Sequence, residues 1–370
     1  MIVKNESHII LETLQSIKHY LDYWVICDTG STDNTMSLIQ DFFDREGIPG
    51  ELHAENWVNF GHNRSQVFDY AYQKADYLWV IDADDLLVGH IDINRLDADS
   101  YSLRYGSDLI YWRPQLFKGS EHWKYKGVLH EYAFCVSKPE ASKGFIAGDY
   151  HMVSRRLGAR NLVAPVVKYL CDAQVLEQAL QQETDPDLTT RYLFYIAQSY
   201  RDAAQPQLAI EWYQKRIAAG GWQEEVWYAQ YEIGLLYEAL GDTQKAKHHY
   251  LKAYEYRPTR AEALYSVGKM CNLHQQFFQA HIFLSAALKI SPPPDLLFVS
   301  KDVYHYLIAF ELSISAYWTG DFQWSVLLCN QLITMKDQIP SHIFEQTKKN
   351  REFSLEKLSL PTHSAAVHND

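Results

Sequence analysis

The chain has 370 residues, of which 47% are hydrophobic, 22% charged and 14% aromatic, and its formal net charge is −12. This length is too great for one ordinary hydrophobic core and predicts two domains. The negative charge argues against a nucleic-acid partner, because proteins hold nucleic acids by displacing counterions with Lys and Arg.

No stretch approaches the roughly 18 consecutive apolar residues of a membrane span, and no basic region followed by an apolar run opens the chain. We therefore expect a cytoplasmic protein. Its five cysteines are scattered without a Cys-x-x-Cys pair, which favours neither a disulfide framework nor a zinc site.

The first half of the chain alternates predicted strands and helices. Strands are expected at residues 1–3, 23–27, 51–54 and 78–81, each pair separated by a helical pattern and short connections. This alternation predicts a mostly parallel sheet wrapped by helices. Further β-type segments are expected at residues 101–105, 109–112 and 115–117.

Three carboxylates, Asp82, Asp84 and Asp85, follow the apolar strand at residues 78–81. Ligands of parallel sheets collect at the carboxyl ends of the strands. Aspartates one residue apart can reach a divalent cation such as Mn²⁺ or Mg²⁺ and the substrate phosphates around it. The alternative is a solvated acidic turn, because Asp-rich loops commonly reverse the chain.

Two more polar residues fall at or just beyond predicted strand ends. Asp28 follows the strand at 23–27 and begins a tight Gly turn. Arg64 lies at the start of the helix that follows the predicted strand at 51–54. With Asp82 they offer an acceptor carboxylate for a base or ribose, and a cation for a diphosphate. The chain has no Gly-x-Gly-x-x-Gly or Gly-Lys-Ser/Thr loop, which weighs against dinucleotide oxidoreductases and P-loop NTPases.

Four motifs in this order carry a resemblance to a known family. They are Met-Ile-Val-Lys-Asn-Glu at 1–6, Asp-Thr-Gly-Ser-Thr-Asp at 28–33, His-Asn-Arg-Ser at 62–65 and Asp-Ala-Asp-Asp at 82–85. Together they resemble the motifs of glycosyltransferase family 2, whose domain has the GT-A fold, over roughly residues 1–155. Such domains have several strand residues before the first motif, so here the first strand is either very short or truncated.

The resemblance implies a site for a nucleoside-diphosphate sugar, with a UDP-sugar as the first choice. It implies that Asp28 contacts the nucleobase, that Arg64 lies near the base or diphosphate, and that Asp82 serves the ribose or sugar. Asp84 would ligate Mn²⁺ or Mg²⁺. The same resemblance adds further residues to the donor site: Val3, Asn5, Glu6, Asn63 and Ala83.

The segment Trp-Lys-Tyr-Lys-Gly-Val-Leu-His-Glu at 123–131 resembles the acceptor-side segment of the same enzymes. Inverting transfer needs a base that takes the acceptor proton. Glu131 is the candidate base, and His130 either orients it or faces the phosphates; the alternative is a structural pair between Glu131 and a nearby Lys. His151 is a candidate extra metal ligand, with a purely structural His as the alternative.

The second half of the chain shows an internal repeat. Ala197, Gly234 and Gly268 align at separations of 37 and 34 residues, and each is followed 12 residues later by an alanine. The second separation is the tetratricopeptide period. Residues 191–340 therefore resemble about four tetratricopeptide repeats, which suit an extended peptide or a neighbouring domain. Residues 156–190 are expected to be a helical connection, and 341–370 a tail with little to bury.

Arg191, Arg201 and Asp202 are more polar than a helix pair needs. They resemble a signature of bacterial proteins that fuse a family 2 domain to tetratricopeptide repeats. Two interpretations stay open: a buried network that joins the two domains, or a part of the donor or acceptor site.

The sequence thus predicts an α/β GT-A domain, Rossmann-like with a mostly parallel sheet, at 1–155, followed by an all-α tetratricopeptide solenoid. The architecture is similar to that of bacterial peptide S-glycosyltransferases of the sublancin type. We expect a metal-dependent, inverting transfer of a hexose to a peptide, protein or glycan acceptor, with the repeats binding the acceptor or a partner. The alternative is an inactive nucleotide-sugar domain in a tetratricopeptide adaptor; homodimerisation is left open.

Overall fold

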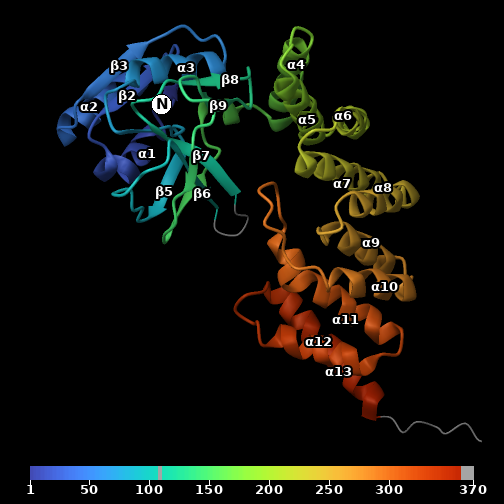
Figure 1. Ribbon diagram of the computed structural model, residues 1–370. Coiled ribbons are helices and arrows are strands. Elements are labelled where there is room, and N and C mark those ends of the chain that lie inside the picture. Colours follow the sequence, from blue (N-terminus) through green and yellow to red (C-terminus); the bar gives the residue numbers. More distant parts are fainter. Residues whose placement is uncertain (107–110, 360–370) are drawn as a thin grey trace, which may run out of the picture. The chain divides into compact units, whose positions relative to one another are not determined.

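The computed structural model describes residues 1–106 and 111–359 and divides into two compact units, Met1–Gly221 and Trp222–Asp370 (Figure 1). The first unit holds all the described strands and the first helices, and the second is helical. The predicted fold class, an α/β domain followed by an all-α repeat array, is confirmed.

A small parallel sheet begins the first unit. Its strands lie in the order β1-β2-β3, with β1 at Ile2–Val3, β2 at Trp24–Asp28 and β3 at Gly50–Ala54. The helices that alternate with these strands are α1 (Ile10–Ile17), with a short 3₁₀ turn η1 (Lys18–Tyr20) after it, α2 (Thr35–Glu46) and α3 (Phe60–Ala71).

Apolar residues at helical spacing explain how α1 and α2 pack on this sheet. Ile10 and Leu14 of α1 and Phe42 and Phe43 of α2 are almost fully buried in one cluster with β2 residues. The ring of Phe43 stacks on Trp24 at a centroid distance of 4.4 Å. Because these side chains recur every three to four residues, each helix presents one continuous apolar side to the strands.

A second sheet follows, in the order β4-β7-β6-β11-β5, with β10 paired to β6. Its strands are β4 (Tyr77–Trp79), β5 (Asp85–Gly89), β6 (Ser100–Tyr105), β7 (Tyr111–Lys118), β10 (Lys143–Phe145) and β11 (Tyr150–Ser154). Strands β8 (Trp123–Lys126) and β9 (Tyr132–Cys135) form a separate antiparallel pair.

One detail of the sheet differs from the sequence prediction. The strand at 78–81 was expected among parallel neighbours, but β4 pairs antiparallel with β7, and the N–H of Val80 continues this ladder to the carbonyl of Gln115 at 2.8 Å. The cause is the eight-residue β7, which offers β4 a longer partner than the two-residue β1 can. The expected strand at 109–112 falls partly on residues 109–110, which lie outside the described part of the chain; residues 111–112 belong to β7.

The end of the first unit is helical. After the short turn η2 (Ala159–Leu162) come α4 (Pro165–Leu180), α5 (Pro186–Asp202) and α6 (Pro206–Ala219). The first repeat helix therefore begins at residue 186, earlier than the predicted 191. The reason is local, because the side chain of Asp185 caps the helix by accepting from the N–H of Asp187 at 2.9 Å, and Pro186 suits the first helical position.

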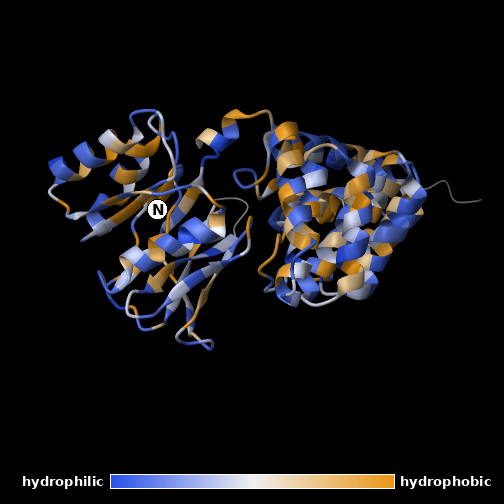
Figure 2. Cartoon of the chain, turned by 90° about the horizontal axis from the view of Figure 1, so that it is seen from above, coloured by the Kyte–Doolittle hydropathy of each residue, from blue (hydrophilic) through white to orange (hydrophobic). Residues whose placement is uncertain are grey.

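The second unit continues the helix pairs. Its helices are α7 (Gln223–Ala239), α8 (Thr243–Tyr256), α9 (Glu262–Leu273), α10 (Phe277–Ala287), a π-helical turn η3 (Val303–Leu307), α11 (Ile308–Trp318), α12 (Phe322–Ile333) and α13 (Ser341–Ser359). Figure 2 shows hydrophilic and hydrophobic residues interleaved along these helices, as amphipathic packing requires.

Small residues let the paired helices approach. A methyl group at Gly234 of α7 would lie 2.5 Å from the ring of Tyr250 in α8, and one at Gly268 of α9 would lie 2.4 Å from Leu284 in α10. The aligned alanines, Ala246 and Ala280, are fully buried. The repeat alignment made from the sequence thus coincides with the points where the helices cross.

The expected tail is partly a helix. Residues 341–359 form α13, which buries Ile343, Thr347 and Ser354, and the hydroxyl groups of Ser325 and Ser354 lie 2.9 Å apart. Small polar side chains at these positions gave little apolar signal in the sequence, yet they fit closely against α12. Residues 360–370 lie outside the described part.

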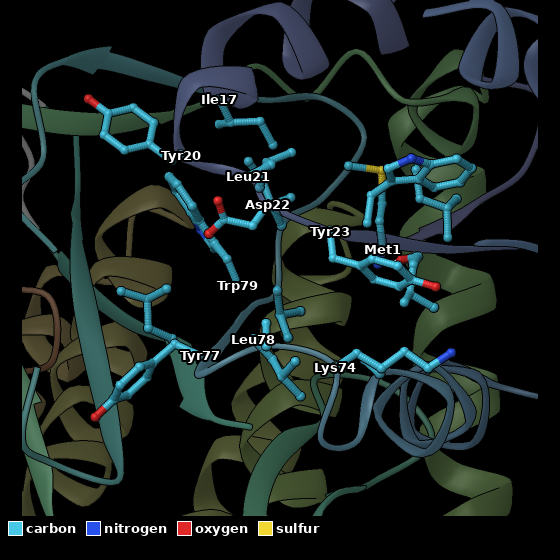
Figure 3. A pocket seen from close by; sticks show the side chains of 18 of the residues that line it. Met1, Ile17, Tyr20, Leu21, Asp22, Tyr23, Lys74, Tyr77, Leu78 and Trp79 are labelled. Carbon is cyan, nitrogen blue, oxygen red and sulfur yellow. The ribbon is translucent and has the colours of Figure 1, made fainter. Parts of the chain in front are cut away.

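An apolar pocket of about 140 Å³ lies in the first unit (Figure 3). It is lined by Met1 and Tyr23 and by Leu78 and Trp79 of β4, among others. Its lining includes none of Asp28, Arg64, Asp82, Asp84 and Glu131, so this pocket is not the site predicted from the motifs. In the described ranges, no helix is both long and apolar enough to cross a membrane.

Candidate active site

Asp28 is the last residue of β2, and only one of its two carboxylate oxygens accepts hydrogen bonds from the described residues. Its Oδ1 accepts from the backbone N–H groups of Gly30 at 2.9 Å and Ser31 at 2.7 Å, in a turn where Gly30 has a φ of 102°. Its Oδ2 is buried and has no hydrogen-bond partner among the described residues, although the residue is only 2% exposed. A buried acceptor without a donor is costly, so this atom is a candidate for a ligand N–H.

The first motif braces the Asp28 turn. The carbonyl of Val3 accepts from the N–H of Thr29 at 2.9 Å, and the side chain of Asn5 accepts from the N–H of Thr32 at 2.7 Å. Glu6 points elsewhere, since its carboxylate accepts from the N–H of Ala159 at 3.2 Å. Val3 and Asn5 therefore shape the turn, and Glu6 ties it to the segment after β11.

Arg64 forms the centre of a charge network. Its guanidinium, only 8% exposed, pairs with Asp82 through NH2, and its Nε lies 2.7 Å from Oε1 of Glu131. The second pair lacks the alignment of a good hydrogen bond, so it is an ion pair. Burial lowers the pKa of Arg64, but the carboxylates of Asp82 and Glu131 raise it above its ordinary value. The structure thus brings three predicted residues together.

Arg113 of β7 is a partner that the sequence analysis missed. Its NH1 lies 2.8 Å from Asp82 and 3.9 Å from Asp85. Burial opposes ionisation of Asp82, but Arg113 and Arg64 together hold the pKa of this carboxyl below its ordinary value. No local pattern marked it, because β7 also carries the polar residues Gln115 and Lys118.

In contrast to Asp82, Asp85 has a pKa above its ordinary value. It is fully buried, its Oδ2 accepts from the hydroxyl group of Tyr105 at 2.6 Å, and Tyr105 accepts in turn from Gln115 at 2.5 Å. Burial and the nearby charge of Asp82 raise the pKa of Asp85 to about 7. Within the described residues, Asp85 Oδ1 and Gln115 Oε1 have no partner. Asp82 is therefore ionised at neutral pH, whereas Asp85, three residues later, is only partly ionised.

Two predicted donor residues have structural roles. Asn63 is fully buried, and its side-chain amide bonds to the preceding loop. The amide oxygen accepts from the N–H of Val58 at 2.9 Å, and the amide nitrogen donates to the carbonyl of Asn56 at 2.9 Å. Ala83 is buried, and its carbonyl accepts from the hydroxyl group of Thr13 at 2.6 Å. Their side chains do not face an open site.

Asp84 meets the segment after β11. Its Oδ2 accepts from the N–H groups of Leu157 at 2.9 Å and Gly158 at 3.1 Å. In residues 1–106 and 111–359, no group of three or more His, Cys, Asp and Glu side chains is arranged to hold a metal ion. A Mg²⁺ or Mn²⁺ ion would therefore rely on Asp84 and on oxygens of the substrate, which is how Mg²⁺ commonly binds beside phosphates.

His151 does not join Asp84. It pairs in register with Val88 on β5, while Ser154 pairs with Asp85. At about 3.3 Å per residue, His151 lies three residues along the strand from the Asp85 position, roughly 10 Å away. The strand register therefore argues against His151 as a ligand to the same ion, and a metal-binding role of His151 stays a prediction.

His130 is held in a left-handed conformation, with a φ of 56°. Its ring stacks on Tyr195 of α5 at 3.8 Å, with an interplanar angle of 4°. The surrounding protein, together with the cations Arg191, Arg160 and Lys168, lowers the pKa of His130, although part of the residue is exposed. These surroundings favour the neutral form of the imidazole in the protein without a bound anion.

A basic cluster adjoins Asp84 and His130. Burial and the charges of Arg160 and Arg156 lower the pKa of Lys168, whose Nζ donates to the amide oxygen of Asn161 at 2.5 Å. Arg160 pairs with Asp172 and lies over the ring of Phe60 at 5.2 Å. Like charges gathered in this way favour an anionic ligand. The sequence analysis treated these residues only as part of a helical connection.

Residues 1–96 match the family model described as glycosyl transferase family 2. Residues 228–260 match the tetratricopeptide repeat model. The resemblances stated from the motifs and from the repeat period are confirmed.

Two curated relatives are similar in the N-terminal part. The SPbeta prophage-derived glycosyltransferase SunS of Bacillus subtilis (strain 168) is 35% identical over 88 residues, which are 23% of this chain and 19% of the relative. The glycosyltransferase SunS of Bacillus phage SPbeta gives the same values. The matched part of the chain thus spans 19% of the length of these relatives.

Solved structures give matches of low overall similarity. A tetratricopeptide repeat protein from Parabacteroides merdae ATCC 43184 has a TM-score of 0.39 and 18% identity, covering 52% of this chain and 68% of that one. BtubC (BKLC) from P. vanneervenii has a TM-score of 0.36 and 18% identity, covering 55% and 80%.

An Asp85→Asn variant tests the buried carboxyl. Between about pH 4 and pH 7 the folded protein keeps a proton that the unfolded chain has released, so Asp85 makes stability fall as the pH rises across this window. We expect the variant, in metal-free buffer, to melt several degrees above the native protein at pH 8, with the difference shrinking towards pH 4. The exposed Asp41→Asn is the control. A difference in melting temperature that does not change with pH would contradict this prediction.

Proposed function

We propose that the protein is a glycosyltransferase that moves a hexose from a nucleoside-diphosphate sugar, with a UDP-sugar as the first choice, to a peptide, protein or glycan acceptor. The observation that carries the proposal is the buried, unpartnered Oδ2 of Asp28 at the end of β2. It lies in the segment that matches glycosyl transferase family 2, which also supplies Arg64 and Asp82. The similarity to glycosyltransferases named SunS supports the same activity.

Asp28 would recognise the nucleobase. Its Oδ1 is held by the turn, so its Oδ2 keeps a fixed direction for accepting a ring N–H. A charged acceptor in a dry setting makes a strong hydrogen bond. Trp57, which is 43% exposed, lies in the loop that Asn63 holds. This loop follows the carboxyl end of β3, where Ala54 pairs with Asp28.

The diphosphate would be held by cations. Arg156 and Lys168 supply positive charge beside Asp84, and Arg160, which is paired with Asp172, lies next to them. An anion would relieve the repulsion among these cations. Arg64 and Arg113 are already paired with carboxylates, namely Asp82, Asp85 and Glu131. These two arginines therefore attract a further anion only weakly. The basic cluster after β11 is therefore the better diphosphate site.

A divalent ion is part of the proposal. Asp84 is the residue that would hold Mn²⁺ or Mg²⁺, with the diphosphate oxygens completing its coordination. When bound, such an ion neutralises charge on the leaving diphosphate. Asp82 does not fit this role, because two guanidinium groups already occupy its oxygens.

Glu131 would act as the base in an inverting displacement. The acceptor oxygen, sulfur or nitrogen attacks the anomeric carbon, the bond from that carbon to the diphosphate oxygen breaks, and the acceptor proton passes to the Glu131 carboxylate. The structural alternative predicted a Lys partner, whereas the partner found is Arg64. To take a proton, the carboxylate must exchange Arg64 for the acceptor group.

The helical repeats would bind the acceptor or a partner protein. The match to the tetratricopeptide model supports protein binding, and peptides are the first acceptor class to test. Cys27, Cys135, Cys171, Cys271 and Cys329 are free thiols, which supports a reducing compartment such as the cytoplasm.

A thermal-shift screen with UDP, UDP-glucose, UDP-N-acetylglucosamine and GDP-mannose tests the donor site, each with and without Mn²⁺. A ligand that binds the folded state raises the melting temperature. We expect a UDP compound to raise it, and Mn²⁺ to enlarge the effect. Asp28→Asn keeps an oxygen for the turn but turns the second acceptor into a donor, so its affinity should fall about tenfold or more.

The exposed Asp41→Asn serves as the matched control and should bind like the native protein. No shift with any nucleotide would favour the alternative, an adaptor without transferase activity. If Asp28→Asn binds the nucleotide as tightly as the native protein, Asp28 does not recognise the nucleobase.

Glu131→Gln tests the base. The amide cannot take the acceptor proton, so the rate of sugar transfer should fall about 10²- to 10⁴-fold while the dissociation constant for the donor stays nearly the same. Glu140→Gln, at an exposed position, is the control. A transfer rate within about twofold of the native protein would exclude Glu131 as the base.

A further inference from the structure

The geometry of α5 points to a role beyond helix packing. We propose that α5, through Arg191 and Tyr195, is a positioning element that holds the segment 127–132 so that Glu131 faces the donor site. This inference rests on the proposed function for the role of Glu131. It makes the first helix of the repeat array a part of the catalytic unit, all within Met1–Gly221.

Arg191 binds the backbone of the residue directly before Glu131. Its Nε donates to the carbonyl of His130 at 2.6 Å, and its guanidinium lies over the rings of Tyr132 at 5.3 Å and Tyr195 at 5.0 Å. The residues on both sides of Glu131 are thus held by one side chain. Arginine suits this task because its planar group can donate and stack at the same time.

His130 needs such support. A φ of 56° is unusual for a residue with a side chain and costs free energy that the surroundings must offset. The stack of His130 on Tyr195, with ring centroids 3.8 Å apart, and the bond from Arg191 supply this support from one helix. These two contacts therefore support the backbone conformation of the residue directly before Glu131.

Further contacts join the same segment to α5. The N–H of Val128 donates to the hydroxyl group of Tyr192 at 3.1 Å, and Lys126 pairs with Asp185 at 2.8 Å. Leu129 is buried in a cluster with residues of α4 and α5, namely Leu176, Leu188, Tyr192 and Ile196. On α5, positions 188, 192 and 195 lie on one side at helical spacing, so the whole side serves this contact.

Glu131 is therefore held from two directions. Arg191 fixes its backbone from α5, and Arg64 pairs with its carboxylate from α3. Apolar contacts at Leu129 would be enough to dock the helix. The guanidinium of Arg191 instead binds the carbonyl of His130, next to Glu131, and so sets the direction of the Glu131 side chain. This agrees with the second of the two interpretations left open for Arg191.

The experiment compares Arg191→Ala, Arg191→Lys, Tyr195→Ala and Tyr195→Phe in the full chain. Displacing a catalytic group by about 1 Å can cost about 10²-fold in rate. We expect Arg191→Ala and Tyr195→Ala to lower kcat for sugar transfer about 10- to 100-fold, with the donor KM within about twofold. Arg191→Lys should recover part of the rate, and Tyr195→Phe, which keeps the stack, nearly all of it.

Lys215→Ala is the matched control. Lys215 is an exposed cation on the neighbouring helix α6, where its Nζ lies over the ring of Trp212 at 3.6 Å. It should leave kcat unchanged. Hydrogen exchange followed by mass spectrometry gives a readout that does not depend on activity: amides of residues 127–132 should exchange faster in Arg191→Ala than in the native protein or the control.

The outcomes separate this inference from the proposed function. A native protein that binds no nucleotide and transfers no sugar would overturn the proposed function and, with it, this role of α5. An active native protein whose Arg191→Ala variant keeps its kcat would overturn this inference alone. Unchanged exchange in residues 127–132 would also overturn it, because the segment would then not depend on α5.

Discussion

A buried guanidinium must be paired, and Arg64 imposes this requirement on the first unit. The side chain is 8% exposed, and its charge is met by Asp82 at the end of the fourth predicted strand and by Glu131 far along the chain. An unpaired charge at this depth would be strongly destabilising. The two carboxylates must therefore come to the same place, which brings the α/β motifs and the acceptor-side segment into one site.

The pairing with Glu131 draws further elements into this unit. The segment that presents Glu131 is bonded on its other side to α5, so the helices after β11 belong to the same compact unit as the sheets. This explains why the compact unit ends at Gly221, past the boundary near residue 155 expected from the motifs. The first unit thus includes the helices α4, α5 and α6, and the helices from α7 onward belong to the second unit.

Much of this arrangement could be predicted from the sequence. Strand ends, the Gly turn after Asp28 and the repeat period follow from local patterns. The four motifs located Asp28, Arg64 and Asp82, and the separate segment at 123–131 located Glu131. Two motif residues, Asn5 and Asn63, were assigned to the donor, but they satisfy loop amides because short polar side chains do this readily.

Other features depend on contacts between distant segments, which local patterns do not encode. Arg113 became visible only once β7 lay beside the acidic residues. The register of β11 with β5 separates His151 from Asp84, and a register cannot be read from composition. The basic cluster at Arg156, Arg160 and Lys168 is assembled by folding of a segment that looked like a connection.

The most direct test of the central claim is a double-mutant cycle on the two partners of Arg64. Unfolding free energies would be measured by urea denaturation for Asp82→Asn, Glu131→Gln and the double variant. If both carboxylates neutralise one buried guanidinium, the double variant should lose more stability than the sum of the single variants, by about 0.5–3 kcal/mol. Losses that simply add would mean that Asp82 and Glu131 do not share Arg64, and would contradict the account.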